Sequence, residues 1–478
     1  MSEKISRRKF LAAVGGIAAA AVVGGVAWYL YTSAPPTPTP TATTTTPTAA
    51  RPSRIRYSTH PFYFPPDAEK EYEKITGIDV ETTYLEFFVM TQKQLADPTA
   101  WDVAASGRYR PIIAEGLARP IPVEKVPRWR PDKVLDMFYH VEKYFKPAQV
   151  KRFNYLLWHE YGKTLIAVPV MWNFDSVTYL PEFLPYEERG GTKRTLAYSE
   201  LWNPEWKGRT GMQDEAFTVF SETANYLEAT EQMTFSGAIT SLTEEEVDAV
   251  FNYLLPYVKQ GFIKTFWFSY GDIVSLFSTR EVWLASTWQP VCFDTRKAGT
   301  PAYYAALQHG PFFWYNSGYV SSLVSPEVAE EGIRLLNWHL ELYTQMLYTR
   351  QGYPSPAWAW EDYKNAMGDE FYGWFYEGKS TYLPIEEVMK IIWPNKPEFA
   401  TLPERLQNAL FLPDVYFKHF WTGEPPRKGT PHPRGNVRDL GSVDDKQRMT
   451  RYFLSPDLPD NNEYYVRKFE ELKAALPV

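Results

Sequence analysis

Few residues in this chain are spaced in a way that predicts catalysis. The seven histidines are scattered along the 478 residues without the spacing of metal ligands, and the sequence has no GxGxxG, P-loop, HExxH or GxSxG motif. Cys292, the single cysteine, lies in an apolar run, which predicts an inert buried thiol and excludes an intrachain disulfide. We therefore expect a protein that is not an enzyme and that holds no metal or other cofactor.

Aromatic side chains are the most abundant groups that could bind a ligand. They make up 17% of the chain, with 17 Trp, 33 Tyr and 29 Phe. Any one ring can belong to a core or can line a cleft that stacks on flat or cationic molecules, and the composition leaves both alternatives open. The net charge of −7 argues against a nucleic-acid partner and is compatible with a cationic ligand.

One stretch in the middle of the chain organises the elements that would position such a site. Residues 167–179 form an apolar run that predicts a buried strand, and Pro169 inside it belongs at a strand edge or where the chain crosses between sheets. A turn-rich segment follows at 201–208, and Asp214 and Glu215 open a predicted helix. This order predicts the hinge and one wall of a two-lobed cleft.

Strand–loop–helix units are predicted before this stretch. The strands lie at 53–59, 78–83 and 101–105, and a helix at 65–75 has proline in its first turn and Gly77 just past its end. In open α/β sheets, ligands bind at the loops that follow the strands. Beyond the stretch, the sequence predicts helices at 243–261, 326–348 and 463–476, and strands at 281–288 and 310–317.

Three segments, 168–172 (VPVMW), 201–208 (LWNPEWKG) and 214–215 (DE), together resemble the spermidine/putrescine-binding branch of the solute-binding proteins that serve ABC importers. The resemblance implies an α/β fold of the type II periplasmic-binding-protein kind, with two Rossmann-like lobes joined by crossing hinge strands. It implies lobe 1 at 53–168, lobe 2 at 169–308, a return to lobe 1 at 309–356 and a C-terminal helical region at 357–478 that packs on lobe 2.

The resemblance also implies a ligand site made of rings and carboxylates. Polyamine binders of this kind hold ammonium groups with several carboxylates and sandwich the methylene chain between aromatic rings. For this sequence, the resemblance implies that the aromatic walls of the site are Tyr63, Trp288 and Trp314, and that one of the ligand carboxylates is Glu215.

The sequence departs from the family's pattern at several of these positions. Phe62, Thr218 and Asn316 stand where the resemblance implies acids, and a buried ammonium without its counter-charge costs several kcal/mol. His60 replaces an aromatic residue. Arg108 and Arg110 enter a loop that usually lacks them, where they pair with a ligand carboxylate or phosphate, point to solvent or bridge to acids across the cleft rim. The candidate ligand-binding residues are His60, Tyr63, Arg108, Trp172, Glu215, Ser269, Trp288, Trp314, Asn316 and Tyr353.

The N-terminus has the pattern of an export segment. Residues 6–11 (SRRKFL) resemble a twin-arginine motif, and positions 11–31 carry no charged side chain. Cleavage as a signal and retention as an anchor are both open, and we favour a membrane helix within 1–32 because the run is long for a signal. A disordered Thr/Pro-rich stalk is predicted at 33–52.

The predicted function is that of an extracytoplasmic solute-binding protein of an ABC importer. It captures a polyamine-like or other small amine between its lobes and delivers it to a permease with a cytoplasmic ATPase, as a monomer tethered to the membrane. A sugar or an organic anion in the same fold is the first alternative. A secreted enzyme exported by the twin-arginine route and a scaffold with a decayed cleft are alternatives of other classes.

Overall fold

A mixed sheet with α-helices packed against it forms the centre of the structure, a computed structural model that describes residues 51–60, 63–184, 196–350, 352–379, 440–449 and 457–477. Within these ranges the sheet has nine strands in the order β2-β1-β3-β12-β7-β10-β8-β9, with β11 beside β7. The described elements belong to one compact unit. The predicted α/β class is confirmed.

The first half of the sheet consists of three parallel strands, β1 (Arg54–Thr59), β2 (Asp79–Tyr84) and β3 (Val103–Ser106). They are connected through α2 (Pro66–Thr76) and α3 (Phe87–Ala96), and α4 (Arg110–Ala114) follows β3. Helix α2 has proline in its first turn and ends at Gly77, whose φ of 71° lies in the left-handed region that glycine adopts at little cost. The predicted strand–loop–helix units are therefore present.

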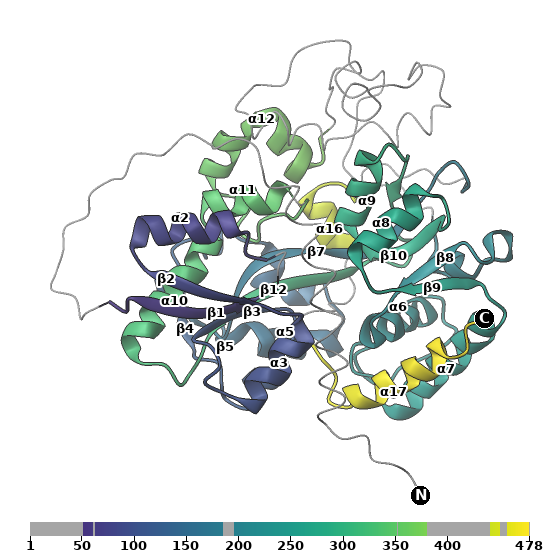
Figure 1. Ribbon diagram of the computed structural model, residues 1–478, viewed down its shortest axis with the longest axis horizontal. Helices are drawn as coiled ribbons and strands as arrows, with labels where there is room; N and C mark the ends of the chain where they lie inside the picture. The colour runs from purple at the N-terminus through teal and green to yellow at the C-terminus, as the bar shows by residue number, and fades with distance from the viewer. Residues whose placement is uncertain are drawn as a thin grey trace, which may run out of the picture. The chain divides into compact units, whose positions relative to one another are not determined.

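Two long antiparallel strands, β7 (Val168–Tyr179) and β12 (Phe312–Val320), join the two halves of the sheet (Figure 1). Strand β12 pairs with β3 at one end, and β7 continues past β12 to pair with β10. Every residue of both strands is buried. The register shifts between Asn316 and Ser317, opposite Pro169, which accommodates a residue that cannot donate to the ladder.

The second half of the sheet consists of β8 (Thr210–Gln213), β9 (Ile263–Trp267) and β10 (Leu284–Trp288), with the short β11 (Tyr303–Tyr304) against β7. Its helices are α6 (Ala216–Ala229), α7 (Glu244–Lys259), α8 (Tyr270–Ser278) and α9 (Gln289–Lys297). The predicted capping box between Thr243 and Glu246 opens α7.

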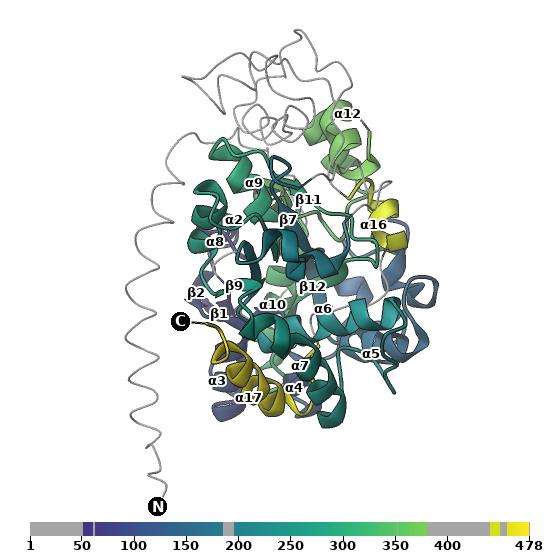
Figure 2. The ribbon, with the colours of Figure 1, turned by 90° about the vertical axis from the view of Figure 1, so that its right-hand side faces the viewer.

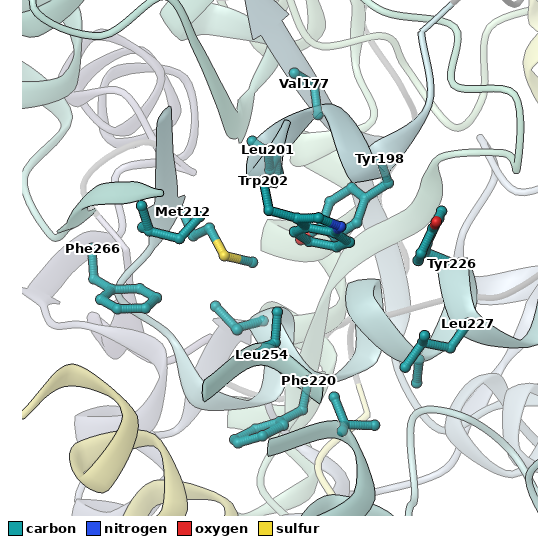
Figure 3. Close-up of a cluster of buried hydrophobic side chains, with 14 of the residues drawn as sticks. Val177, Tyr198, Leu201, Trp202, Met212, Phe220, Tyr226, Leu227, Leu254 and Phe266 are labelled. Atoms are coloured by element: carbon teal, nitrogen blue, oxygen red, sulfur yellow. The ribbon is translucent and has the colours of Figure 1, made fainter. Parts of the chain in front are cut away.

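The core of the second half lies around α6, which is buried from Ala216 to Leu227. Figure 3 shows part of this core, including Trp202, Met212, Phe220 and Leu254. A helix that is covered on nearly all sides is held by its neighbours rather than by intrinsic propensity. Polar side chains on α6 are consequently buried as well.

The prediction of a single helix at 326–348 is wrong, because the chain forms two helices there, α10 (Pro326–His339) and α11 (Leu342–Arg350). The break follows the buried His339, whose Nδ1 lies 2.6 Å from the hydroxyl of Tyr348. It also lets Gln345 Nε2 reach the backbone carbonyl of Val170 at 2.9 Å. These polar contacts compensate for helical hydrogen bonds that the break removes.

Residues 123–165, whose sequence shows no clear period, form a small sheet together with the preceding two residues, and they also contain a helix and short 3₁₀ turns. The strands are β4 (Ile121–Pro122), β5 (Trp158–Glu160) and β6 (Thr164–Leu165), and the helix is α5 (Pro147–Leu157). The 3₁₀ turns lie at Val123–Lys125, Asp136–Phe138 and Val141–Lys143. Two more, Tyr198–Trp202 and Pro204–Trp206, form the predicted turn-rich segment.

The described C-terminal helices pack against different parts of the molecule. Helix α17 (Asn462–Lys473) packs on α6 and α7 of the second half. Helix α12 (Glu361–Glu377) contacts the segment before α5, where Arg128 pairs with Asp362 at 2.7 Å. Figure 2 shows α16 (Val443–Met449) beside α12. The predicted boundaries at 168/169, 308/309 and 356/357 stay predictions.

The predicted membrane segment and stalk lie almost wholly outside the described residues, which begin at Arg51. Among the helices that are described, none combines the length and the apolar character needed to cross a bilayer.

Candidate functional site

Tyr63, Trp314 and Tyr353 meet where the loop after β1, strand β12 and the segment after α11 come together. The ring centroids of Tyr63 and Trp314 are 6.5 Å apart, and those of Trp314 and Tyr353 are 5.5 Å apart, both edge to face. Phe87 at the start of α3 stacks on Tyr63 at 5.0 Å. All three predicted residues are buried. Side chains far apart in the sequence therefore form one ring cluster.

Polar groups border this ring cluster on two sides. Asn316 lies near the hydroxyl of Tyr63, and burial raises the pKa of that hydroxyl above its ordinary value. The imidazole of His60 lies 5.2 Å from the ring of Tyr63, and its Nε2 is 3.2 Å from a carboxylate oxygen of Glu86. Among the described residues, Nδ2 of Asn316 has no hydrogen-bond partner. The cluster thus presents an unused donor next to its rings.

Arg108 and Glu215 form an ion pair between the two halves of the sheet. Arg108 follows β3 in the first half, and Glu215 immediately precedes α6 in the second half. The Arg108 Nη2 donates to Glu215 Oε1 at 2.6 Å, and the guanidinium lies 5.2 Å from the ring centroid of Phe217. Thr218 donates to the other carboxylate oxygen of Glu215. The acid that the resemblance assigns to an ammonium is therefore already paired with a cation.

Asp175 on β7 is a candidate that the sequence reasoning missed. Its carboxylate accepts a hydrogen bond from Trp314 Nε1 at 2.8 Å, and in the sheet register it lies opposite both Trp288 and Phe312. Burial, together with the nearby carboxylates of Glu222 and Glu215, raises the pKa of Asp175 well above its ordinary value. The available signal was a lone charged residue inside a strand that is otherwise uncharged.

Glu222, two turns after Glu215 on α6, is a second acid that sequence reasoning missed. It is buried, and it accepts hydrogen bonds from Tyr198 Oη at 2.8 Å and Ser286 Oγ at 2.6 Å. Burial raises the pKa of Glu222 to about 7, against the effect of these hydrogen bonds. A glutamate in a helix is typical of a solvent-facing position, so the sequence offered no signal for it.

Trp288 and Ser269 form a separate group at the ends of β10 and β9. Trp288 is half-buried, and its ring lies edge to face with Trp267 at 5.3 Å. Ser269 accepts a hydrogen bond from the backbone of Asp272 and caps α8. Asp175 is the register partner of Trp288 and the hydrogen-bond partner of the Trp314 side chain, so it lies between this group and the ring cluster.

Trp172 lies apart from the other candidates. It faces the opposite side of the sheet from Trp314, because it pairs with Tyr315 whereas Trp314 pairs with Asn173. It is fully buried, its ring contacts Phe313 at 5.8 Å, and its Nε1 donates to the carbonyl of Ser355 at 2.9 Å. Trp172, predicted as a ligand-binding residue, is therefore part of the core and does not face the ring cluster.

Two expectations from the sequence remain, one about Phe62 and one about metal binding. Phe62, expected to replace an acid, lies outside the described residues. In the part of the chain that the structure describes, no group of three or more His, Cys, Asp or Glu side chains is placed to hold a metal ion.

Solved structures with similar folds include a putative spermidine/putrescine ABC transporter from Listeria monocytogenes, with a TM-score of 0.49 and 15% identity over 78% of this chain and 98% of that one. A spermidine/putrescine ABC transporter substrate-binding protein from Streptococcus pneumoniae has a TM-score of 0.48 and 13% identity over 88% of this chain and 99% of that one.

Sequence comparisons agree with the resemblance noted in the sequence. The spermidine/putrescine-binding periplasmic protein of Escherichia coli (strain K12) is 25% identical over 303 residues, which are 62% of this chain and 75% of that protein. The profile of the family described as "Bacterial extracellular solute-binding protein" matches residues 68–359. Since this match covers more than half of the chain, the protein belongs to the bacterial extracellular solute-binding protein family.

Proposed function

We propose that this chain captures a small organic amine between two lobes outside the cytoplasm and delivers it to the permease of an ABC importer. The observation that carries the proposal is the ring cluster of Tyr63, Trp314 and Tyr353 next to the carboxyl groups of Asp175 and Glu215. Ring faces attract cations and methylene chains, and carboxylates supply the counter-charge. The curated relative's name, a spermidine/putrescine-binding protein, supports the same class of ligand.

The acids missing from the family's positions do not count against an amine. Thr218 and Asn316 replace two of them, but Asp175 and Glu222 place two other carboxyl groups close by on β7 and α6. A bound ammonium can therefore find its counter-charge from a different set of elements. The buried acids are also costly to keep charged without a cation, which favours binding of one.

The proposed mechanism is closure of two lobes about a hinge. The two halves of the sheet are the lobes, and β7 and β12 connect them. A solute that contacts residues of both halves shifts the population toward the closed form. The proposal also includes export and membrane tethering by residues 1–32 and a stalk formed by residues 33–52. The receptor is monomeric and non-catalytic.

The test is a melting screen of the full chain against polyamines, sugars, amino acids, quaternary amines and oxyanions. A ligand at about a thousandfold its Kd adds roughly 4 kcal/mol of stability. We expect hits among the amines, and we expect Trp288→Ala and Glu215→Ala to abolish the shift. Trp172→Phe is the matched control, since Trp172 lies on the other face of the sheet. Full affinity in both site variants, or hits confined to sugars, contradicts the proposal.

An organic anion is the second candidate, and two buried donors favour it. Within the described residues, Nε of Arg108 and Nδ2 of Asn316 have no hydrogen-bond partner. Both can donate to a carboxylate or a similar oxygen. Oxyanion hits in the same screen that disappear in Arg108→Gln would establish this candidate instead.

A further inference from the structure

A small recess lies beside Asp175, between β7, α6 and the segment that leads into β12. Its volume of about 10 Å³ leaves room for about one water-sized group. It is lined by Asp175, Tyr198, Glu222, Asn225, Leu307, His309, Gly310 and Phe312.

Hydrogen-bond acceptors dominate the polar part of this lining. Asp175 and Glu222 contribute carboxyl groups, and the side chain of Asn225, which is 6% exposed, contributes a carbonyl. The Asn225 Nδ2 donates to the backbone carbonyl of Gly310 at 3.1 Å, whereas its Oδ1 has no partner among the described residues. No Lys or Arg is among the lining residues, and the ring of His309 packs edge to face on Tyr226 at 5.4 Å.

The existing donors leave part of this acceptor capacity unused. Glu222 accepts hydrogen bonds from the hydroxyls of Tyr198 and Ser286, and Asp175 accepts one from the indole N–H of Trp314. A carboxylate has about four lone-pair sites, so each acid can accept further donors. Burial raises the pKa of both acids, and it raises that of Glu222 to about 7. A group with several N–H donors and a positive charge fits this lining better than water does.

We propose that the recess receives a primary ammonium group of the bound solute, with N–H donors directed at Asp175, Glu222 and Asn225. This inference rests on the proposed function, an amine between two lobes, and narrows the substrate class to amines with an unsubstituted –NH3+ end. A primary ammonium has three donors and is close to water in size. A quaternary ammonium has no donor and exceeds the recess. Asp175 also contacts Trp314, so a methylene chain on the ring cluster would end here.

The test is calorimetric titration of the full chain with 1,5-diaminopentane and with its fully N-methylated analogue. We expect the primary diamine to bind at least about tenfold more tightly. Titration at pH 6 in two buffers of different ionisation enthalpy measures proton release. The wild-type chain should release about one proton, because the ammonium displaces the proton of Glu222, whose pKa burial raises to about 7.

Glu222→Gln should weaken binding of 1,5-diaminopentane at least about tenfold and remove about one released proton. Glu228→Gln on the same helix is the matched control, since Glu228 pairs with Lys146 away from the recess. If Glu222→Gln does not fold, the proton release measured with the wild-type chain tests the inference instead. Diamine binding without proton release would then overturn it.

The outcomes separate this inference from the proposed function. Unchanged affinity and proton release in Glu222→Gln overturn the inference and leave amine binding intact. Failure of every amine to bind overturns both. A further outcome is that ammonium chloride or potassium chloride raises the melting temperature of the wild-type chain but not of Glu222→Gln, while both chains bind the diamine equally well. That result would identify an inorganic cation as the occupant of the recess and would also overturn the inference.

Discussion

Replacing Arg108 by glutamine tests whether this arginine competes with the bound solute. Its guanidinium bonds Glu215 at 2.6 Å and lies 5.2 Å from the ring centroid of Phe217. An ammonium needs the same carboxylate and can use the same ring face. In the variant, Glu215 loses this cation, so we expect an amine to bind more tightly than in the wild-type chain.

The expected size follows from the burial of the pair. The side chains of Arg108 and Glu215 are 9% and 35% exposed. The pair therefore lies between a surface ion pair, worth up to about 1 kcal/mol, and a buried hydrogen bond to a charged group, worth about 1.5–3 kcal/mol. A ligand that displaces Arg108 loses this contribution. Since about 1.4 kcal/mol is tenfold in Kd, we expect the Kd to fall about tenfold in the variant.

The assay is calorimetric titration of 1,5-diaminopentane into wild-type chain, Arg108→Gln and a matched control, Arg110→Gln. Arg110 is two residues further on, and it pairs with Asp460 at 2.5 Å and donates to the carbonyl of Leu458. The control should leave the Kd unchanged. An unchanged Kd in Arg108→Gln refutes competition, and weaker binding there means that Arg108 contacts the solute directly.

Three other predictions concern the site and its support. Trp314→Phe keeps a ring but removes the indole donor, so diamine affinity should fall about tenfold in calorimetry, whereas Trp172→Phe should change only the melting temperature. Asp457→Asn leaves Arg152 without its buried partner at 2.6 Å and should cost about 3–5 kcal/mol in urea denaturation; a loss below 1 kcal/mol would contradict this estimate. Burial raises the pKa of Glu222 from 4.5 to about 7, so the folded chain keeps a proton there that the unfolded chain releases. Stability from this group is full below about pH 4.5 and is lost as the pH rises through 7, by about 3 kcal/mol; an equal pH profile in Glu222→Gln would argue against this assignment.

Local signals in the sequence predicted most of the architecture. The capping box of Thr243 and Glu246, the proline-first helix ending at Gly77 and the apolar run at 167–179 all correspond to observed elements. Each depends on residues within a few positions of one another, so a single sequence contains the necessary information. Pro169 was predicted at a strand edge or at a crossing between sheets. It is the second residue of β7, inside one sheet, and the register shift lies opposite it.

The candidate site was harder to predict because its contacts are not local. The Arg108–Glu215 pair joins residues 107 positions apart, and the acids Asp175 and Glu222 are buried by elements from other parts of the chain. Trp172 shows the same difficulty, since the face on which it lies depends on the register of β7 against β12. The break between α10 and α11 likewise depends on the tertiary hydrogen bonds of His339 and Gln345.

The most direct test of amine capture between the two halves of the sheet is a crystal structure of the full chain with the amine that gives the largest melting shift. We predict a methylene chain against Tyr63 and Trp314, and an ammonium nitrogen within about 3 Å of a carboxylate oxygen of Asp175 or Glu215. An amine bound away from this ring cluster, with Arg108 still on Glu215, would contradict the account.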